Sequence, residues 1–251
     1  MFNHGGMEQR YKVDAVICDL DGTLVDSAAD LCAALNEILA DLKLRTLTLE
    51  DVRGMIGDGV FTLIERGLAA ASGDAGLASS LVAKFLAIYE ADPTRHTRCF
   101  PGVVETLAAL KEQGCRLAVV TNKPVCATRK ILDSLKLQDF FEVVVGGDSV
   151  AHRKPHPAPL LEAARQFGLQ PADLVMVGDN IHDVEAARGA RMRSIAVTYG
   201  YHHQPPGTFG ANALIDRFEE LAPLLEVARA PQGVRLGRYQ ESTIQCIDKK
   251  I

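Results

Sequence analysis

The stretch VDAVICDLDGTLVDSAADL, residues 13–31, joins an apolar run to three acidic residues. The run VDAVICDL is short and rich in β-formers, which is typical of a strand buried in a sheet. Asp19 and Asp21 follow at its end, and Asp26 comes after a Gly-Thr turn. Because charges at the end of a buried strand cost free energy unless they are paired, the stretch predicts partners of opposite charge nearby.

The composition is that of an ordinary soluble chain: 251 residues, 47% hydrophobic and 24% charged. The net charge of -5 gives no indication of nucleic acid or of an acidic membrane as a partner. The start MFNHGGMEQR has no apolar signal region, and no run reaches the roughly 20 apolar residues of a membrane helix. The six cysteines form no C-x-x-C pair, which predicts reduced thiols and a cytoplasmic protein.

Strand and helix patterns alternate along the second part of the chain, which predicts βαβ units and a parallel sheet. Residues 212–228 add a short strand and a helix. The expected strands are 116–122, 141–147, 173–179 and 193–200, and the expected helices are 101–114, 124–137, 158–169 and 180–190.

An uninterrupted run of helical patterns separates the first strand from this alternation, and it extends from Ala28 to about Ala91. The sequence therefore predicts an α/β fold, a doubly wound, Rossmann-like parallel sheet with an inserted all-helical cap. We expect the core at 9–27 and 95–228 and the cap at 28–94, with hinge candidates where the chain crosses between them. The tail 229–251 is either disordered or an edge strand that includes STIQCI.

Polar side chains follow the expected strands at the edge where parallel sheets bind ligands. Two like charges near 4 Å cost about 1 kcal/mol in water and about 4 kcal/mol near a protein surface, so several acids together require a cation. All-oxygen ligands favour a hard ion, and we expect Mg²⁺. The residues at this edge are Asp19, Asp21, Thr121, Asn122, Lys154, Asp179 and Asp183.

A magnesium site with a lysine and a hydroxyl beside it suits a phosphate ester. Lys154 offsets the phosphoryl charge, Thr121 and the amide of Asn122 bind its oxygens, and Asp19 attacks phosphorus. Asp21 protonates the leaving oxygen and then deprotonates water. Gly22 lets the backbone turn close to the phosphate.

The motifs DLDGTLVDS, VVTNK, RKPHP and VGDNIHD resemble, in order, the four signature motifs of the haloacid dehalogenase superfamily. The resemblance implies a Rossmann-like core, Mg²⁺ dependence and an aspartyl-phosphate on Asp19, with Asp21 as acid and base. It implies that Asp19, the Asp21 carbonyl and Asp179 hold the metal, with Asp183 binding it directly or through water. Asp21 argues against the dehalogenase branch, which lacks this second acid.

The segment GMIGDGVFTLIERGL, residues 54–68, resembles the C1-type helical cap of phosphoglycolate phosphatases. Gly57, Gly59, Leu63 and Arg66 match its pattern, so the resemblance implies substrate contacts for the two glycines and Arg66. A turn made by the glycines and a solvated Arg66 is the simpler alternative. Four histidines, of which His182 is the best candidate for lining the site, are expected near the rim: His152, His156, His182 and His202.

The leading hypothesis is a Mg²⁺-dependent phosphatase of 2-phosphoglycolate, acting as a monomer or homodimer on a small phosphate ester. One alternative is a phosphatase of sugar phosphates or of N-acetylmuramate 6-phosphate. Another is a phosphotransferase resembling β-phosphoglucomutase. From a different class, a phospho-accepting signalling module also uses acids, a threonine and a lysine around Mg²⁺, and it would give a stable phosphoprotein instead of turnover.

Overall fold

A six-stranded parallel sheet forms the centre of the computed structural model, which describes residues 10–228. Its strand order is β6-β5-β2-β7-β8-β9, so the chain winds outward from β2 on one side and then crosses back to β7 on the other. The carboxyl end of β2 lies at this reversal, where ligands bind in such sheets. The strands are β2 (Ala15–Cys18), β5 (Arg116–Val120), β6 (Val143–Val145), β7 (Leu174–Gly178), β8 (Arg193–Val197) and β9 (Ala213–Ile215).

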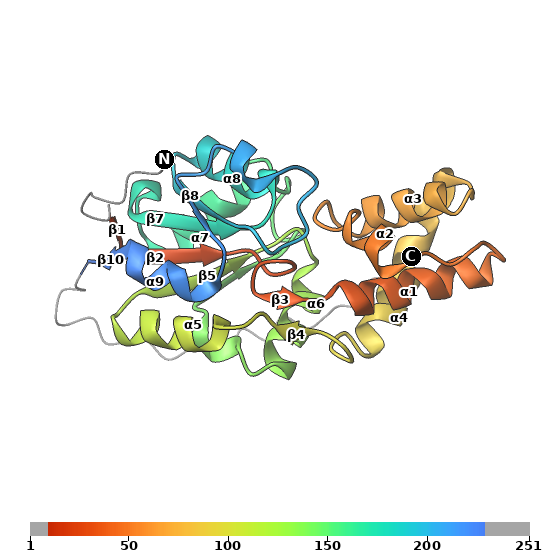
Figure 1. Cartoon of the computed structure of the whole chain (residues 1–251), viewed down its shortest axis with the longest axis horizontal. Helices are drawn as coiled ribbons and strands as arrows, with labels where there is room; N and C mark the ends of the chain where they lie inside the picture. Colours follow the sequence, from red (N-terminus) through yellow and green to blue (C-terminus); the bar gives the residue numbers. More distant parts are fainter. Residues whose placement is uncertain (1–9, 229–251) are drawn as a thin grey trace, which may run out of the picture.

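Helices cover both faces of the sheet (Figure 1), and alternate strand residues point to opposite faces. Val16 and Cys18 belong to one buried apolar cluster, and Ala15 and Ile17 belong to the other. The first face packs on α5 (Val103–Glu112), α6 (Val125–Ser134) and α9 (Leu221–Leu224), and the second on α7 (Ala158–Phe167) and α8 (Ile181–Ala190). The sheet is thus doubly wound, and the predicted fold class is confirmed.

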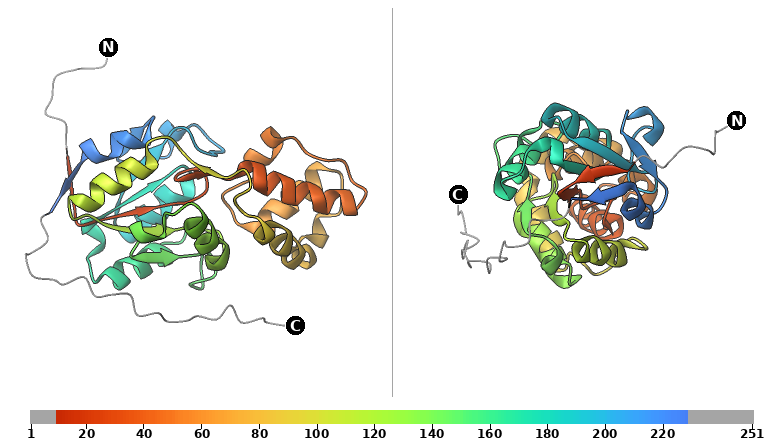
Figure 2. Two further views of the ribbon diagram at one scale, coloured as in Figure 1. Left: turned by 90° about the horizontal axis from the view of Figure 1, so that it is seen from below. Right: turned by 90° about the vertical axis from the view of Figure 1, so that its left-hand side faces the viewer.

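Four helices form a separate group beyond the end to which β2 points (Figures 1 and 2). Two short antiparallel strands, β3 (Val25–Asp26) and β4 (Arg98–Cys99), pair where the chain enters and leaves this group, so the two connections lie side by side. The helices are α1 (Ala28–Asp41), α2 (Leu49–Arg53), α3 (Val60–Ala70) and α4 (Ala78–Ala91). Short 3₁₀ turns lie at Ala75–Leu77, Gln138–Phe140, Pro171–Asp173, Pro206–Thr208 and Phe218–Glu220.

The helical group has its own apolar interior, which is continuous with the sheet's first cluster. Leu35, Leu68 and Phe85 are fully buried there, and each such side chain contributes about 1.5–3 kcal/mol. Gly67 lies inside α3 because a Cβ at this position would come within 2.7 Å of Leu35. A capping box lies at the start of α2, since Thr48 accepts from the Asp51 amide and Asp51 accepts from the Thr48 amide.

Two local predictions were wrong. The expected first strand is split at Asp14, and β1 (Tyr11–Val13) pairs with β10 (Leu225–Val227) in a small second sheet. The expected last helix is reduced to Leu221–Leu224, because the chain after it is extended along β1.

The predicted tail 229–251, with STIQCI, lies outside the described residues. Over residues 10–228, no helix combines the length and the apolar character needed to cross a membrane.

Candidate active site

Three buried carboxylates form what we term the acidic cluster: Asp19 and Asp179, at the carboxyl ends of β2 and β7, and Asp183, in the first turn of α8. Each offers an oxygen, and these oxygens lie within 4.8 Å of one another. Burial raises the pKa of Asp19 to about 6, although Lys154 opposes the shift. Burial, with Asp19 and Asp183 nearby, raises the pKa of Asp179 well above its usual range. The ionised cluster is therefore costly without additional positive charge.

Close backbone packing fixes Asp179 in this cluster. Its carboxylate accepts from the Thr23 hydroxyl at 3.1 Å and from the Tyr201 amide at 2.6 Å. Gly22 has a φ of +89°, and a Cβ there would lie 2.3 Å from Asp179 Oδ2. Gly22 was predicted to let the backbone approach a phosphate, and in this structure its missing side chain makes room for Asp179.

Lys154 is the cation in contact with the acidic cluster. Its Nζ lies 2.6 Å from Asp183 Oδ1, 2.8 Å from Asp19 Oδ1 and 2.8 Å from the Val120 carbonyl. Burial alone would lower the pKa of Lys154, but the carboxylates of Asp183 and Asp19 raise it above its ordinary value. One lysine thus faces three carboxylates, which leaves an excess of negative charge.

Asp183 has a structural role in addition to its place in the cluster. Its Oδ2 accepts from the Asn180 amide at 3.0 Å and completes a capping box at the start of α8. The helix start therefore holds this carboxylate toward Lys154 and the other two acids.

The donor set fits a divalent metal ion. Asp19 Oδ1 is buried, and Lys154 Nζ is the partner that lies 2.8 Å from it, so one ammonium faces three carboxylates. The cluster supplies only oxygen ligands, which hard cations prefer. The acidic cluster is therefore the candidate metal centre.

Asp21 lies outside the acidic cluster and pairs with Lys123, and we term these two residues the Lys123 pair. Lys123 Nζ is 2.8 Å and 3.0 Å from the two Asp21 oxygens, and the Ser27 hydroxyl donates to Oδ1 at 2.5 Å. The Tyr89 ring of α4 lies 4.6 Å from the same Nζ. Sequence reasoning assigned no role to Lys123, although it directly follows Thr121 and Asn122 at the same strand end.

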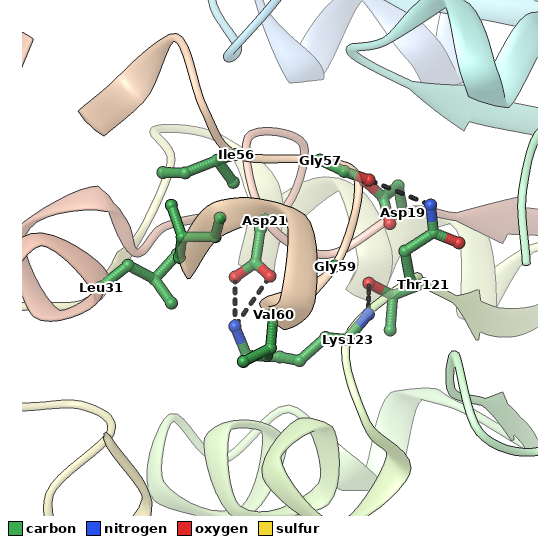
Figure 3. A pocket seen from close by; sticks show the side chains of 11 residues that line it. Asp19, Asp21, Leu31, Ile56, Gly57, Gly59, Val60, Thr121 and Lys123 are labelled. Atoms are coloured by element: carbon green, nitrogen blue, oxygen red, sulfur yellow. Dashed lines mark hydrogen bonds and ion pairs between the residues drawn. The ribbon is translucent and has the colours of Figure 1, made fainter. Parts of the chain in front are cut away.

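A small cavity of about 40 Å³, room for about three water molecules, lies between this rim and the helical group (Figure 3). The sheet side contributes polar and charged residues and the helical side mostly apolar ones. The cavity is lined by Asp19, Asp21, Thr121, Asn122 and Lys123 on the first side, and by Leu31, Ile56, Gly57, Gly59, Val60 and Leu63 on the second.

Asn122 connects the loops around the cavity. Its Nδ2 donates to the Gly57 and Lys154 carbonyls, both at 3.0 Å, and its Oδ1 accepts from the Lys154 amide at 3.0 Å. Because the side chain is used in this way, the predicted phosphate contact of Asn122 is left to its backbone N–H. Gly57 and Gly59 have φ of +118° and +90°, and Gly59 caps α3, so the predicted glycine turn is present beside the cavity.

Arg66 does not line the cavity, and its predicted contact with substrate has no support in this geometry. Its guanidinium lies 2.5 Å from Asp58 and donates to the Met55 carbonyl at 3.2 Å. His182 is 3.0 Å from the other Asp58 oxygen, and His203 is 3.7 Å from the Arg66-bound oxygen. Asp58 thus connects the helical group to the sheet side.

The remaining predicted histidines also lie away from the cavity lining. The rings of His152 and His156 contact each other at 4.4 Å. His202 Nε2 lies 3.2 Å from the Thr198 carbonyl.

Comparison with known proteins identifies the family. Residues 16–197 match the family model of haloacid dehalogenase-like hydrolases. The chain belongs to this family. It is 40% identical to Phosphoglycolate phosphatase 1 of Pseudomonas aeruginosa, over 85% of this chain and 80% of the relative. It is 42% identical to a phosphoglycolate phosphatase of Caulobacter vibrioides, over 80% and 85% of the two chains.

Among solved structures, a predicted phosphoglycolate phosphatase from Haemophilus somnus 129PT matches with a TM-score of 0.80 and 33% identity, over 87% of this chain and 99% of that one. The predicted resemblance is therefore confirmed, and the chain is a hydrolase of the haloacid dehalogenase family.

Proposed function

We propose that this hydrolase is a Mg²⁺-dependent phosphatase that cleaves 2-phosphoglycolate to glycolate and phosphate. The observation that carries the proposal is the buried acidic cluster, whose Asp19 also lines a small cavity. The names of the similar chains support the same substrate. In this proposal residues 9–27 and 95–228 are the catalytic core, and residues 28–94 are the cap.

In this proposal the metal is held by Asp19, Asp179, Asp183 and the Asp21 carbonyl. When bound, Mg²⁺ offsets the charge of the cluster and of the phosphoryl group. Lys154 is already in contact with Asp19, so it places a further positive charge beside the reacting atoms. The Thr121 hydroxyl lines the cavity and donates to a phosphoryl oxygen.

Asp19 attacks phosphorus, so an Asp19 oxygen–phosphorus bond forms as the ester oxygen–phosphorus bond breaks. Asp21, which lines the same cavity, gives a proton to the departing glycolate oxygen. It then takes a proton from the water that cleaves the aspartyl-phosphate. Asp19 is regenerated, and phosphate leaves.

The lining of the cavity supports a small ester. Leu31, Ile56, Val60 and Leu63 make the cap side apolar, so it offers no side-chain partners to the hydroxyl groups of a sugar phosphate. The cytoplasmic location and the monomer or homodimer stay predictions.

The test is phosphate release from a panel of esters with Mg²⁺, with a chelator, and with Mg²⁺ restored. The panel contains 2-phosphoglycolate, sugar phosphates, N-acetylmuramate 6-phosphate, pyrophosphate, nucleotides and a generic aryl phosphate. We expect the highest kcat/KM for 2-phosphoglycolate and a reversible loss with chelator. A higher kcat/KM for a sugar phosphate would contradict the proposed substrate, and a stable phosphoprotein without turnover would contradict the phosphatase.

A further inference from the structure

We propose that Lys123 is the specificity residue that binds the substrate's carboxylate, and this inference rests on the proposed function. Lys123 lines the cavity together with Asp19 (Figure 3). A substrate whose phosphoryl group lies at Asp19 then places its other end against Lys123 and the cap. In 2-phosphoglycolate that end is a carboxylate, separated from the phosphoryl group by one oxymethylene unit.

The walls of the cavity make a cation necessary for such a substrate. The side chains of Leu31, Ile56, Val60 and Leu63 give the cap side an apolar surface. A carboxylate moved from water against apolar groups is costly unless it is paired. Among the described residues that line the cavity, Lys123 is the one cation.

Three other cations lie near the cavity but outside its lining, and the Nε of one of them, Arg153, donates to the Gly147 carbonyl at 3.0 Å. Lys154 contacts Asp19, Asp183 and the Val120 carbonyl, on the metal side of the site. Arg66, the residue that the sequence pattern favoured, is paired with Asp58 outside the lining. Of the described cations in this region, Lys123 is therefore the one that lines the cavity where the carboxylate would lie.

The neighbours of Lys123 hold its ammonium at the edge of the cavity. The side chain is 5% exposed, and its contacts are the Asp21 carboxylate and the Tyr89 ring. An ammonium has three donors, and two short contacts go to Asp21. Tyr89 packs against the same ammonium through its ring, and its buried hydroxyl interacts with Lys123 as well.

The contact between Lys123 and Asp21 also explains how Lys123 can both bind the substrate's carboxylate and orient Asp21. Lys123 reaches Asp21 from the sheet side, and Tyr89 reaches Lys123 from helix α4 of the cap. A carboxylate bound at Lys123 lies next to Asp21, the group that serves the departing oxygen. A positioning role alone would affect every ester equally, whereas carboxylate binding affects only esters that carry this group.

The experiment compares two substrates that differ in this group, 2-phosphoglycolate and 2-hydroxyethyl phosphate. The variants are Lys123→Gln, which keeps a donor for Asp21 without the charge, and Lys123→Arg, which keeps the charge. Lys84→Gln is the matched control, because Lys84 pairs with Asp41 on the exposed surface of the cap. Each variant is measured for kcat and KM on both esters, and its folding is checked by thermal unfolding.

We expect Lys123→Gln to lower kcat/KM for 2-phosphoglycolate at least about tenfold more than for 2-hydroxyethyl phosphate, with a higher KM. Lys123→Arg restores part of the preference, and Lys84→Gln leaves both values unchanged. Because the result is a ratio within one variant, partial unfolding cancels. Equal losses on both esters in Lys123→Gln, with a wild type that prefers 2-phosphoglycolate, would overturn this inference alone. A wild type without that preference would overturn the proposed substrate and the inference together.

Discussion

The acidic cluster and the Lys123 pair lie on the same rim but differ in charge balance. The cluster contains three buried carboxylates and one contacting lysine, Lys154. The pair contains one carboxylate, Asp21, and one lysine. The first region therefore needs further positive charge to be stable, and the second is already neutral. The difference separates a region suited to a metal and a phosphoryl group from one suited to the rest of the substrate.

The two regions also differ in what holds them. The acidic cluster is built from strand ends and the start of α8, all within the sheet-bearing part of the chain. The Lys123 pair is completed by Ser27, next to α1, and by Tyr89 of α4. Substitutions in the helical group should therefore alter the geometry of the Lys123 pair more than that of the acidic cluster, because the cluster is held by the sheet.

The largest effect is expected for Asp19→Asn. The amide is a poor nucleophile, so kcat should fall by about 10⁴-fold or more on every ester, while the fold persists. Steady-state kinetics and circular dichroism measure the two parts. Asp133→Asn, an exposed change on α6, serves as the control. Near-normal turnover in Asp19→Asn would show that the acidic cluster is not the site of phosphoryl transfer.

Asp179→Asn tests the charge imbalance directly. Removing one carboxylate should leave the metal-free protein as stable as the wild type, or more stable, because the ionised Asp179 is buried among like charges. For the wild type, Mg²⁺ at about 100 times its Kd adds about 2.7 kcal/mol, or about 5–10 °C in Tm. The variant should lose most of this gain and about 100-fold or more in kcat/KM. Thermal unfolding with and without Mg²⁺ measures the difference.

If Asp179→Asn is less stable than the wild type without metal and is still stabilised by Mg²⁺, the main role of Asp179 is structural, through the hydrogen bonds that it accepts from Thr23 and Tyr201. The acidic cluster would then be a structural network rather than a metal centre.

Tyr89→Leu is a smaller change aimed at the Lys123 pair alone. Loss of the aromatic face beside Lys123 should raise the KM for 2-phosphoglycolate by about two- to thirtyfold, since a cation–π contact is worth about 0.5–2 kcal/mol. The Mg²⁺-induced shift in Tm should not change. Phe85→Leu is the matched control, because Phe85 is also buried in α4 but stacks on Tyr89 and not on Lys123. Equal KM values in the two variants would argue that α4 acts only through packing.

Short sequence patterns were sufficient to predict the part of the fold in which strands and helices alternate along the chain. Apolar runs and helix periods predicted the parallel sheet, and strand ends predicted that Asp19, Asp179 and Lys154 would meet, because carboxyl ends share one edge. The pairing of β1 with β10 could not be read in this way. Its partners are separated by most of the chain, and neither segment has an alternating pattern long enough to identify it.

The cap residues show the same limit within the site. Arg66 fitted a sequence pattern, but its partner Asp58 lies on the preceding loop, and the direction of its side chain depends on how that loop packs on α8. Lys123 stood next to two predicted site residues, yet its pairing with Asp21 depends on side-chain directions that spacing does not fix.

Arg66→Gln should have the smallest effect, and it separates the sequence pattern from the observed geometry. If Arg66 bound the substrate, its loss would raise the KM for 2-phosphoglycolate well above that for an aryl phosphate. In the structure its guanidinium serves Asp58 and the Met55 carbonyl, and its side chain is 39% exposed, so the pair adds about 0–1 kcal/mol. We expect changes of less than about threefold in kcat/KM, equal for both esters. A selective loss on 2-phosphoglycolate would mean that Arg66 leaves Asp58 to meet the carboxylate, and Lys123 would then no longer be the sole cation that recognises it.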